Sequence, residues 1–92
     1  MSPNSFDAFT AQSLDEGFDE VLVREWPANA VLDTHTHPFD ASVQVVRGSY
    51  ILTVGEEVRQ LKAGDRFRLA RDVPHAEHYG PEGATIWVAR AN

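Results

Sequence analysis

The chain has 92 residues, of which 42% are hydrophobic and 24% charged, and its formal net charge is −6. A chain of this length and composition has room for one core, which predicts a single domain over residues 1–92 and argues against disorder. The 8 lysines and arginines are scattered along an acidic chain, so we expect no nucleic-acid partner.

Cysteine is absent from the sequence. This excludes disulfides, thiolate metal sites and cysteine nucleophiles, so any metal must be bound through nitrogen and oxygen. The first residues, MSPNSFDAFTAQSLDEG, lack a basic stretch followed by an apolar one, and no run approaches the roughly 18 apolar residues of a membrane span. We therefore expect a cytoplasmic protein with no membrane partner.

The N-terminal segment, residues 1–18, is the only part of the chain with a helical pattern. Phe6 and Phe9 fall near helical spacing, Ser5 can cap the first turn, and Gly17 can end the last one. The pattern predicts a short helix.

From residue 19 to residue 91 the sequence becomes a series of short β-type runs. Each run is rich in Val, Ile, Leu, Phe or Trp and is bounded by Gly, Pro, Asn or Asp, as turns require. The predicted strands are 20–26, 30–36, 41–47, 49–54, 57–62, 66–70, 75–79 and 84–90. Short antiparallel strands must close their edges, so the pattern predicts an all-β jelly-roll sandwich or a small barrel.

His35 and His37 lie one residue apart near the end of the second predicted strand. Side chains alternate along a strand, so both imidazoles should leave the same face with their Cα atoms about 7 Å apart. They could converge on one ion, or they could be two surface histidines at a strand end.

A third histidine, His75, directly follows Pro74, which restricts the chain to an extended conformation at the start of a strand. His75 could equally be a packed strand residue. His78 falls on the opposite face of the same strand and is not expected to be a ligand.

Two stretches together resemble a known family. AVLDTHTHPFDASVQVVRGSY (30–50) and GDRFRLARDVPHAEHY (64–79) are similar to the two motifs of the cupin superfamily, G-x5-H-x-H-x3-4-E-x6-G and G-x5-P-x-G-x2-H-x3-N. The matching positions are His35, His37, Gly48, Gly64 and His75. The first motif departs at its glutamate, where Ala41 or Ser42 stands, and the second departs at Ala70 or Arg71, Asp72 and Tyr79.

The resemblance implies a single-domain cupin, a jelly-roll barrel or double-stranded β-helix over residues 19–91. It also implies that His35, His37 and His75 point inward onto a divalent metal ion. Imidazole ligands suit several metals. We expect iron, with manganese, nickel, zinc or copper as alternatives.

A different carboxylate could replace the missing glutamate. Asp40 precedes the vacant position and would need a bulge to turn inward, whereas Glu77 shares a strand face with His75. Tyr79 has the same parity, so Glu77 and Tyr79 are the candidate catalytic residues. Glu77 could instead be a solvated carboxylate near the barrel mouth, and Tyr79 could simply pack in the barrel.

The resemblance leaves several functions open. Three-histidine cupins include iron dioxygenases, which favours a small-molecule metalloenzyme of dioxygenase or oxidoreductase type. The alternatives are a binding module for a sugar or metabolite, without catalysis, and a metal-dependent isomerase or cyclase. We expect a small-molecule partner and a homodimer, for which the apolar outward positions of ASVQVVR (41–47) together with the N-terminal segment could supply the pairing surface.

Overall fold

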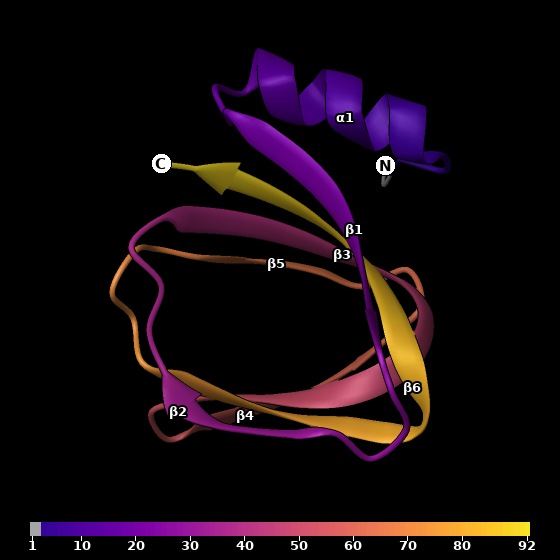
Figure 1. Cartoon of the computed structure of the whole chain (residues 1–92), viewed down its shortest axis with the longest axis vertical. Helices are drawn as coiled ribbons and strands as arrows, with labels where there is room; N and C mark the ends of the chain where they lie inside the picture. Colours follow the sequence, from indigo (N-terminus) through magenta and orange to yellow (C-terminus); the bar gives the residue numbers. More distant parts are fainter. Residues whose placement is uncertain (1–2) are drawn as a thin grey trace.

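The computed structural model describes residues 3–92, so the first two residues of the predicted N-terminal segment lie outside the described part. The helix lies outside a closed arrangement of strands (Figure 1). The elements, in chain order, are α1 (Phe6–Asp15), β1 (Glu20–Trp26), β2 (Val31–His35), β3 (Asp40–Val54), β4 (Glu57–Lys62), β5 (Arg66–Leu69) and β6 (His75–Ala91).

The predicted helix is confirmed as α1, with the predicted ends. Ser5 is its N-cap, and the Ser5 hydroxyl accepts a hydrogen bond of 3.1 Å from the backbone N–H of Ala8. At the other end, Gly17 has a φ of +99° and the N–H of Phe18 donates to the carbonyl of Ser13, which satisfies one of the carbonyls that a helix end leaves free.

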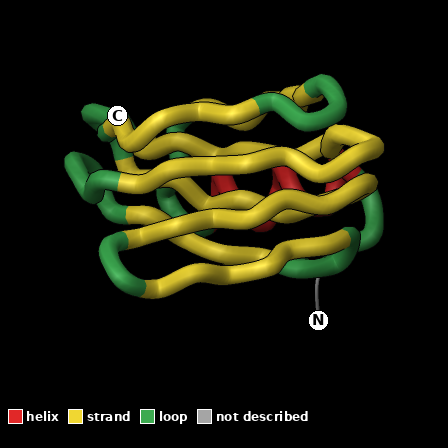
Figure 2. Tube along the Cα trace, turned by 90° about the horizontal axis from the view of Figure 1, so that it is seen from below, coloured by secondary structure: helices red, strands yellow, loops and turns green. Residues whose placement is uncertain are grey.

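The strands form one six-stranded antiparallel sheet that curls around itself. Its main path runs β1-β6-β3-β4, while β2 pairs with β6 and β5 pairs with β3. The two longest strands, β3 and β6, pair with each other along most of their length, and every other strand pairs with one of them. Figure 2 shows the strands lying side by side, with the helix behind them.

The prediction of eight strands is wrong in one respect. Residues 41–47 and 49–54 belong to the single strand β3, and residues 75–79 and 84–90 belong to β6. The predicted breaks at Gly48 and Gly83 are real irregularities, because both glycines have positive φ and the register shifts next to Gly48. Such bulges bend a strand without ending it, so each long strand turns a corner of the barrel.

Alternate positions of the long strands face the barrel interior and form the core. The buried hydrophobic residues are mostly on β3 and β6: Ala41, Val43, Val45, Tyr50, Leu52, Tyr79, Ala84, Ile86 and Val88. Packing of this interior side against the residues of the short strands supplies the hydrophobic stabilisation of the fold. It also fixes which side chains of β2, β3 and β6 point into the barrel.

The outer face near the middle of β3 is covered by the N-terminal segment. Trp87 packs against the rings of Phe6 and Phe9 at centroid distances of 5.8 and 5.7 Å, and Gln44 donates a hydrogen bond to the carbonyl of Pro3. Ser42 and Gln44 are therefore buried within one chain, whereas Val46 on the same strand is only partly buried. The homodimer itself stays a prediction.

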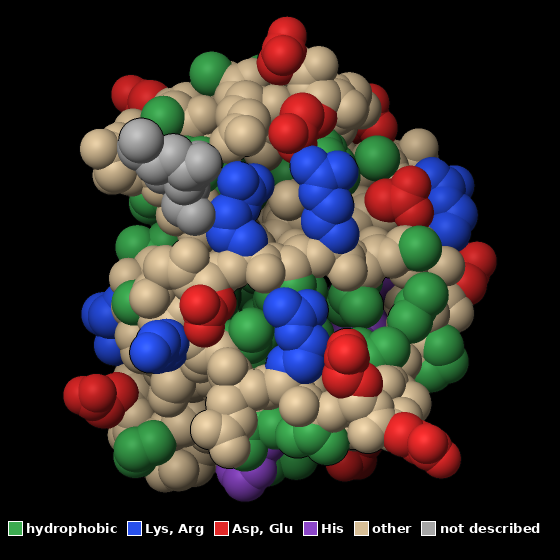
Figure 3. All heavy atoms as spheres, turned by 180° about the vertical axis from the view of Figure 1, so that it is seen from behind, with side chains coloured by type: hydrophobic (Ala, Val, Ile, Leu, Met, Phe, Trp, Pro, Cys, Tyr) green, Lys and Arg blue, Asp and Glu red, His purple; other side chains and the backbone are tan. Residues whose placement is uncertain are grey.

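Within residues 3–92, no helix is long and apolar enough to cross a membrane. On the face drawn in Figure 3, basic and acidic side chains are interspersed, and hydrophobic side chains are visible in a hollow between them.

Candidate metal centre

The fold brings three histidines together from two places in the sequence. His35 ends β2, His75 begins β6, and the two are direct partners in the antiparallel register. His37 lies in the loop that follows β2. The ring centroids are 4.3 Å apart for His35 and His75, 5.0 Å for His35 and His37, and 4.7 Å for His37 and His75. One nitrogen from each ring lies within 4.8 Å of the others.

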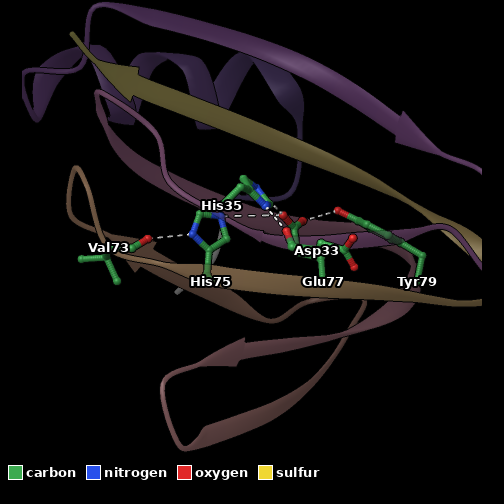
Figure 4. A network of polar contacts seen from close by, with 6 residues as sticks. All are labelled: Asp33, His35, Val73, His75, Glu77 and Tyr79. Atoms are coloured by element: carbon green, nitrogen blue, oxygen red, sulfur yellow. Dashed lines mark hydrogen bonds and ion pairs between the residues drawn. The ribbon is translucent and has the colours of Figure 1, made fainter.

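Backbone carbonyls fix the orientation of two of the rings. Nδ1 of His35 lies 2.7 Å from the carbonyl oxygen of Asp33, and Nδ1 of His75 lies 2.9 Å from that of Val73 (Figure 4). Because a carbonyl only accepts hydrogen bonds, each Nδ1 carries the proton. Each Nε2 then has a free lone pair in the neutral ring, which is the form that binds metals.

The third ring is held by stacking. His37 is parallel to the ring of Phe39, at a centroid distance of 4.8 Å and an interplanar angle of 4°. Burial lowers the pKa of His37 below its usual value, and the neighbouring His75 and His35 lower it further. At neutral pH His37 is therefore an uncharged imidazole with a lone pair to offer.

Glu77 lies beside the cluster, on the interior face of β6. Its Oε2 is 3.4 Å from Nε2 of His35 and 3.7 Å from Nε2 of His75, and its side chain is only 11% exposed. Figure 4 shows the carboxylate between the histidines and Tyr79. The structure thus places Glu77 in the same pocket as His75, as the alternation along β6 predicts.

This arrangement fits a divalent cation. Two nitrogen lone pairs and a carboxylate at these distances repel one another unless a positive charge lies among them. Either protons on the rings or a metal ion can supply that charge, and the carbonyl contacts already direct both Nε2 atoms inward. The donor set of three imidazoles with an adjacent carboxylate suits Fe, Mn, Ni, Zn and Cu.

Tyr79 contacts Glu77 and not the histidines. Its hydroxyl donates a 2.6 Å hydrogen bond to Oε1 of Glu77, and its ring is stacked between Tyr50 and Trp26 at 4.6 and 5.2 Å. Burial raises the pKa of Tyr79 well above its usual range, and the bond to the Glu77 carboxylate raises it further. The Tyr79 hydroxyl therefore stays protonated and donates a hydrogen bond to Glu77, rather than ionising to a phenolate.

Two other sequence candidates lie away from the cluster. Asp40 binds Arg71, accepting hydrogen bonds from its backbone N–H at 2.8 Å and its guanidinium at 3.4 Å, so it does not replace the missing glutamate in this structure. His78 is exposed and faces the neighbours Val31 and Ile51 in the sheet register. It is outside the cluster, as the alternation of β6 predicts.

The histidines line a cavity of about 100 Å³ inside the barrel. Glu77 and Ala41 line it too, so the position of the motif's glutamate does point at the cluster but carries only a methyl group. Apolar side chains form much of the remaining wall, among them Leu32, Phe39, Val43 and Leu69. A larger concavity of about 620 Å³, next to Tyr50 and His78, contains none of the three clustered histidines.

Two basic residues that line this cavity were not predicted from the sequence to belong to the site. Arg24 on β1 and Arg90 on β6 both contribute to its lining. Arg24 alternates with Leu22 and Trp26, and Arg90 alternates with Val88, so each arginine interrupts an inward-facing apolar series. A charged residue at a core-facing position was the available signal.

No protein-family model matches the chain, and no curated protein matches it. Several solved structures are similar to the chain, at low sequence identity. KdgF from a Halomonas species is 23% identical with a TM-score of 0.67, over 78% of this chain and 67% of that one. The cupin domain of Schizosaccharomyces pombe Cnp3 is 20% identical with a TM-score of 0.73, over 84% and 55% of the two chains.

The DMSP lyase DddQ from Ruegeria pomeroyi is 22% identical with a TM-score of 0.71, over 78% of this chain and 37% of that one. The matched region is thus about two thirds of KdgF and about a third of the lyase. These likenesses and the observed topology give the class: the chain has the cupin fold, a double-stranded β-helix. Within this fold, the clustered His35, His37 and His75 form a group that could hold a metal ion.

Proposed function

We propose that this protein is a metal-dependent enzyme that moves a proton on a small organic substrate, with His35, His37 and His75 as the metal ligands. The observation that carries the proposal is the position of Glu77, which is shared between the cluster and Tyr79. One carboxylate oxygen faces Nε2 of two histidines, and the other accepts the hydroxyl of Tyr79. A general base next to a metal site is the arrangement that such proton transfer needs.

A divalent ion held by the three imidazoles would act as a Lewis acid that polarises a substrate oxygen. Glu77 takes a proton from the carbon adjacent to the substrate's carbonyl carbon, which breaks a C–H bond, forms an O–H bond on the carboxyl and delocalises the electron pair onto the carbonyl oxygen. It returns the proton to the same or a neighbouring carbon. Tyr79 contacts Glu77 rather than the cavity, so its role is to orient the carboxylate.

Solvent exchange tests this proposal without knowledge of the natural substrate. The protein is loaded with zinc or manganese and incubated in D2O with a panel of small carbonyl compounds, and NMR follows the loss of C–H signals. We expect exchange with the wild type and a loss of at least about a hundredfold in Glu77→Gln, because a general base contributes about 10²–10⁴-fold. Equal exchange in both proteins would contradict the proposal.

A dioxygenase is the second candidate, and the absence of a carboxylate at Ala41 favours it. With only neutral imidazoles as ligands, the ion keeps its charge and has positions left for substrate. Oxygen uptake separates the candidates: a dioxygenase consumes O2 with iron and is silent with zinc, whereas proton transfer proceeds with either metal. If neither exchange nor uptake occurs with any metal, the chain is a binding module and both catalytic proposals fail.

A further inference from the structure

We infer that the cavity binds a small carboxylate anion, held by the guanidinium groups of Arg24 and Arg90. The inference rests on the proposed function in one respect, since it takes this anion to be the substrate class of the metal centre. It follows from three observations: the environment of each arginine, the balance of charge in the cavity, and the cavity's size.

Arg90 lies on the histidine side of the cavity. Its guanidinium lies 4.6 Å from the centroid of the Phe39 ring, and Phe39 in turn stacks on His37. Within residues 3–92 its buried Nε has no acceptor, and its only ion pair is a 3.4 Å contact with the half-exposed Glu20. Arg90 therefore has donor capacity left for a ligand.

Arg24 lies on the Trp26 side. Its guanidinium lies over the Trp26 ring at 5.2 Å from the centroid, and it forms no hydrogen bond or ion pair with the rest of residues 3–92. The indole Nε1 of Trp26 is buried and has no acceptor in the same part of the chain. Arg24 is exposed, so its donors are hydrated and remain available to a ligand, whereas the buried N–H of Trp26, which lines the same cavity, has no acceptor among the described residues.

The cavity has more basic than acidic side chains in its lining, whereas the protein as a whole is acidic. The chain carries a formal net charge of −6, yet the charged residues lining the cavity are two arginines and one glutamate besides the histidines. A divalent ion would make the cavity more positive still. Guanidinium pairs with carboxylate through two parallel hydrogen bonds, so a carboxylate is the anion that these donors match best.

The volume limits the rest of the ligand. A cavity of about 100 Å³ is smaller than the ~150 Å³ cavity that holds a benzene molecule, so it admits roughly four or five non-hydrogen atoms. Apolar side chains such as Leu32 and Val43 also line the cavity. The ligand class is therefore a short carboxylic acid with a compact apolar body.

A titration with propanoate, against its neutral isostere propanamide, tests the inference. The protein is first freed of metal with a chelator, so that the arginines are tested without the ion. The chain has two tryptophans. NMR follows both indole N–H signals: Trp26 lines the cavity, whereas Trp87 packs outside it against α1 and serves as an internal control.

We expect propanoate to shift the Trp26 signal and not the Trp87 signal, and to bind at least about tenfold more tightly than propanamide. Arg24→Gln should weaken propanoate binding about tenfold, and so should Arg90→Gln. Arg66→Gln is the matched control, because Arg66 also lies over an aromatic ring, at 5.8 Å from Phe9, but outside the cavity. Arg90→Lys tests whether any loss in Arg90→Gln comes from charge or from packing on Phe39.

Equal affinity for propanoate and propanamide would overturn the inference, as would an equal loss of binding in Arg66→Gln. These outcomes are separable from a failure of the proposed function. If the metal-free protein selects propanoate but never binds metal, the anion site stands and the metalloenzyme does not. If metal binds and the arginine variants behave like the wild type, the reverse holds.

Discussion

The hydroxyl of Tyr79 donates a 2.6 Å hydrogen bond to Oε1 of Glu77, which leaves Oε2 facing the histidines. We expect Tyr79→Phe to keep the stacked ring but free the carboxylate to rotate, so the rate of solvent exchange should fall about tenfold with little change in KM. A bond to a charged group contributes about 1.5–3 kcal/mol, so the melting temperature should fall too.

Tyr50→Phe is the control for that variant. The Tyr50 ring stacks on Tyr79 at 4.6 Å, but its buried hydroxyl has no partner within residues 3–92. Removing a hydroxyl without a partner should leave the exchange rate unchanged and the stability equal or higher. If Tyr50→Phe lowers the rate as much as Tyr79→Phe, the effect belongs to the aromatic stack and not to the bond with Glu77.

The vacant glutamate position gives a second prediction. Ala41 is buried, lines the cavity and occupies the position where the cupin motif has a carboxylate. We expect Ala41→Glu to tighten metal binding by about tenfold or more, because it adds an anionic ligand to neutral ones. Competition with a chromophoric chelator measures the affinity. Ala41→Ser is the control, and equal affinity in both variants would show that position 41 does not reach the ion.

The sequence predicted more of the site than of the strand boundaries. Alternation along β6 correctly put Glu77 and Tyr79 on the face of His75 and put His78 on the other, because burial fixes the register of a strand. Alternation could not show that Gly48 bends a strand that continues, since a bulge glycine and a turn glycine look alike in sequence.

Contacts between distant segments also could not be predicted from the sequence. The pairing of Asp40 with Arg71 depends on how the loop after β5 returns to the start of β3, and no local pattern encodes that return. The packing of Phe6 and Phe9 on Trp87 depends on where α1 docks. Helical spacing predicted the helix but not its position on the barrel.

Gly48 is the position where a small substitution should do most harm to the fold. Its φ is +79°, and a Cβ there would overlap the carbonyl oxygen of Gly83. We expect Gly48→Ala to lower the free energy of unfolding by about 2–4 kcal/mol, from backbone strain and a clash with neighbouring backbone. Chemical denaturation measures it.

Gly55→Ala is the matched control, because Gly55 also has a positive φ, of +60°, but open space where the Cβ would stand. It should cost only about 1 kcal/mol, from strain alone. Equal losses in the two variants would mean that the close approach of Gly83 contributes nothing.

Asp40 should make stability depend on pH in the acid range. Hydrogen bonds from the backbone and side chain of Arg71 hold the pKa of Asp40 below its ordinary value of 3.8. Because the folded pKa is the lower one, the ionised carboxylate stabilises the fold above pH 3.8 and this contribution is lost as the pH falls through the folded pKa. Asp40→Asn should therefore melt below the wild type at pH 6, and the gap should narrow as the pH falls below 3.8. A gap that widens on acidification would refute this assignment.

The metal content of the purified protein tests the three-histidine centre most directly. Untagged wild type, His37→Ala, His75→Ala and His78→Ala are loaded with one divalent metal, desalted and measured by elemental analysis. We expect about one ion per chain in the wild type and in His78→Ala, whose histidine lies outside the cluster, and far less than one in the other two variants. Metal content in His75→Ala equal to that of the wild type, or an equal loss in His78→Ala, would contradict the assignment of the site.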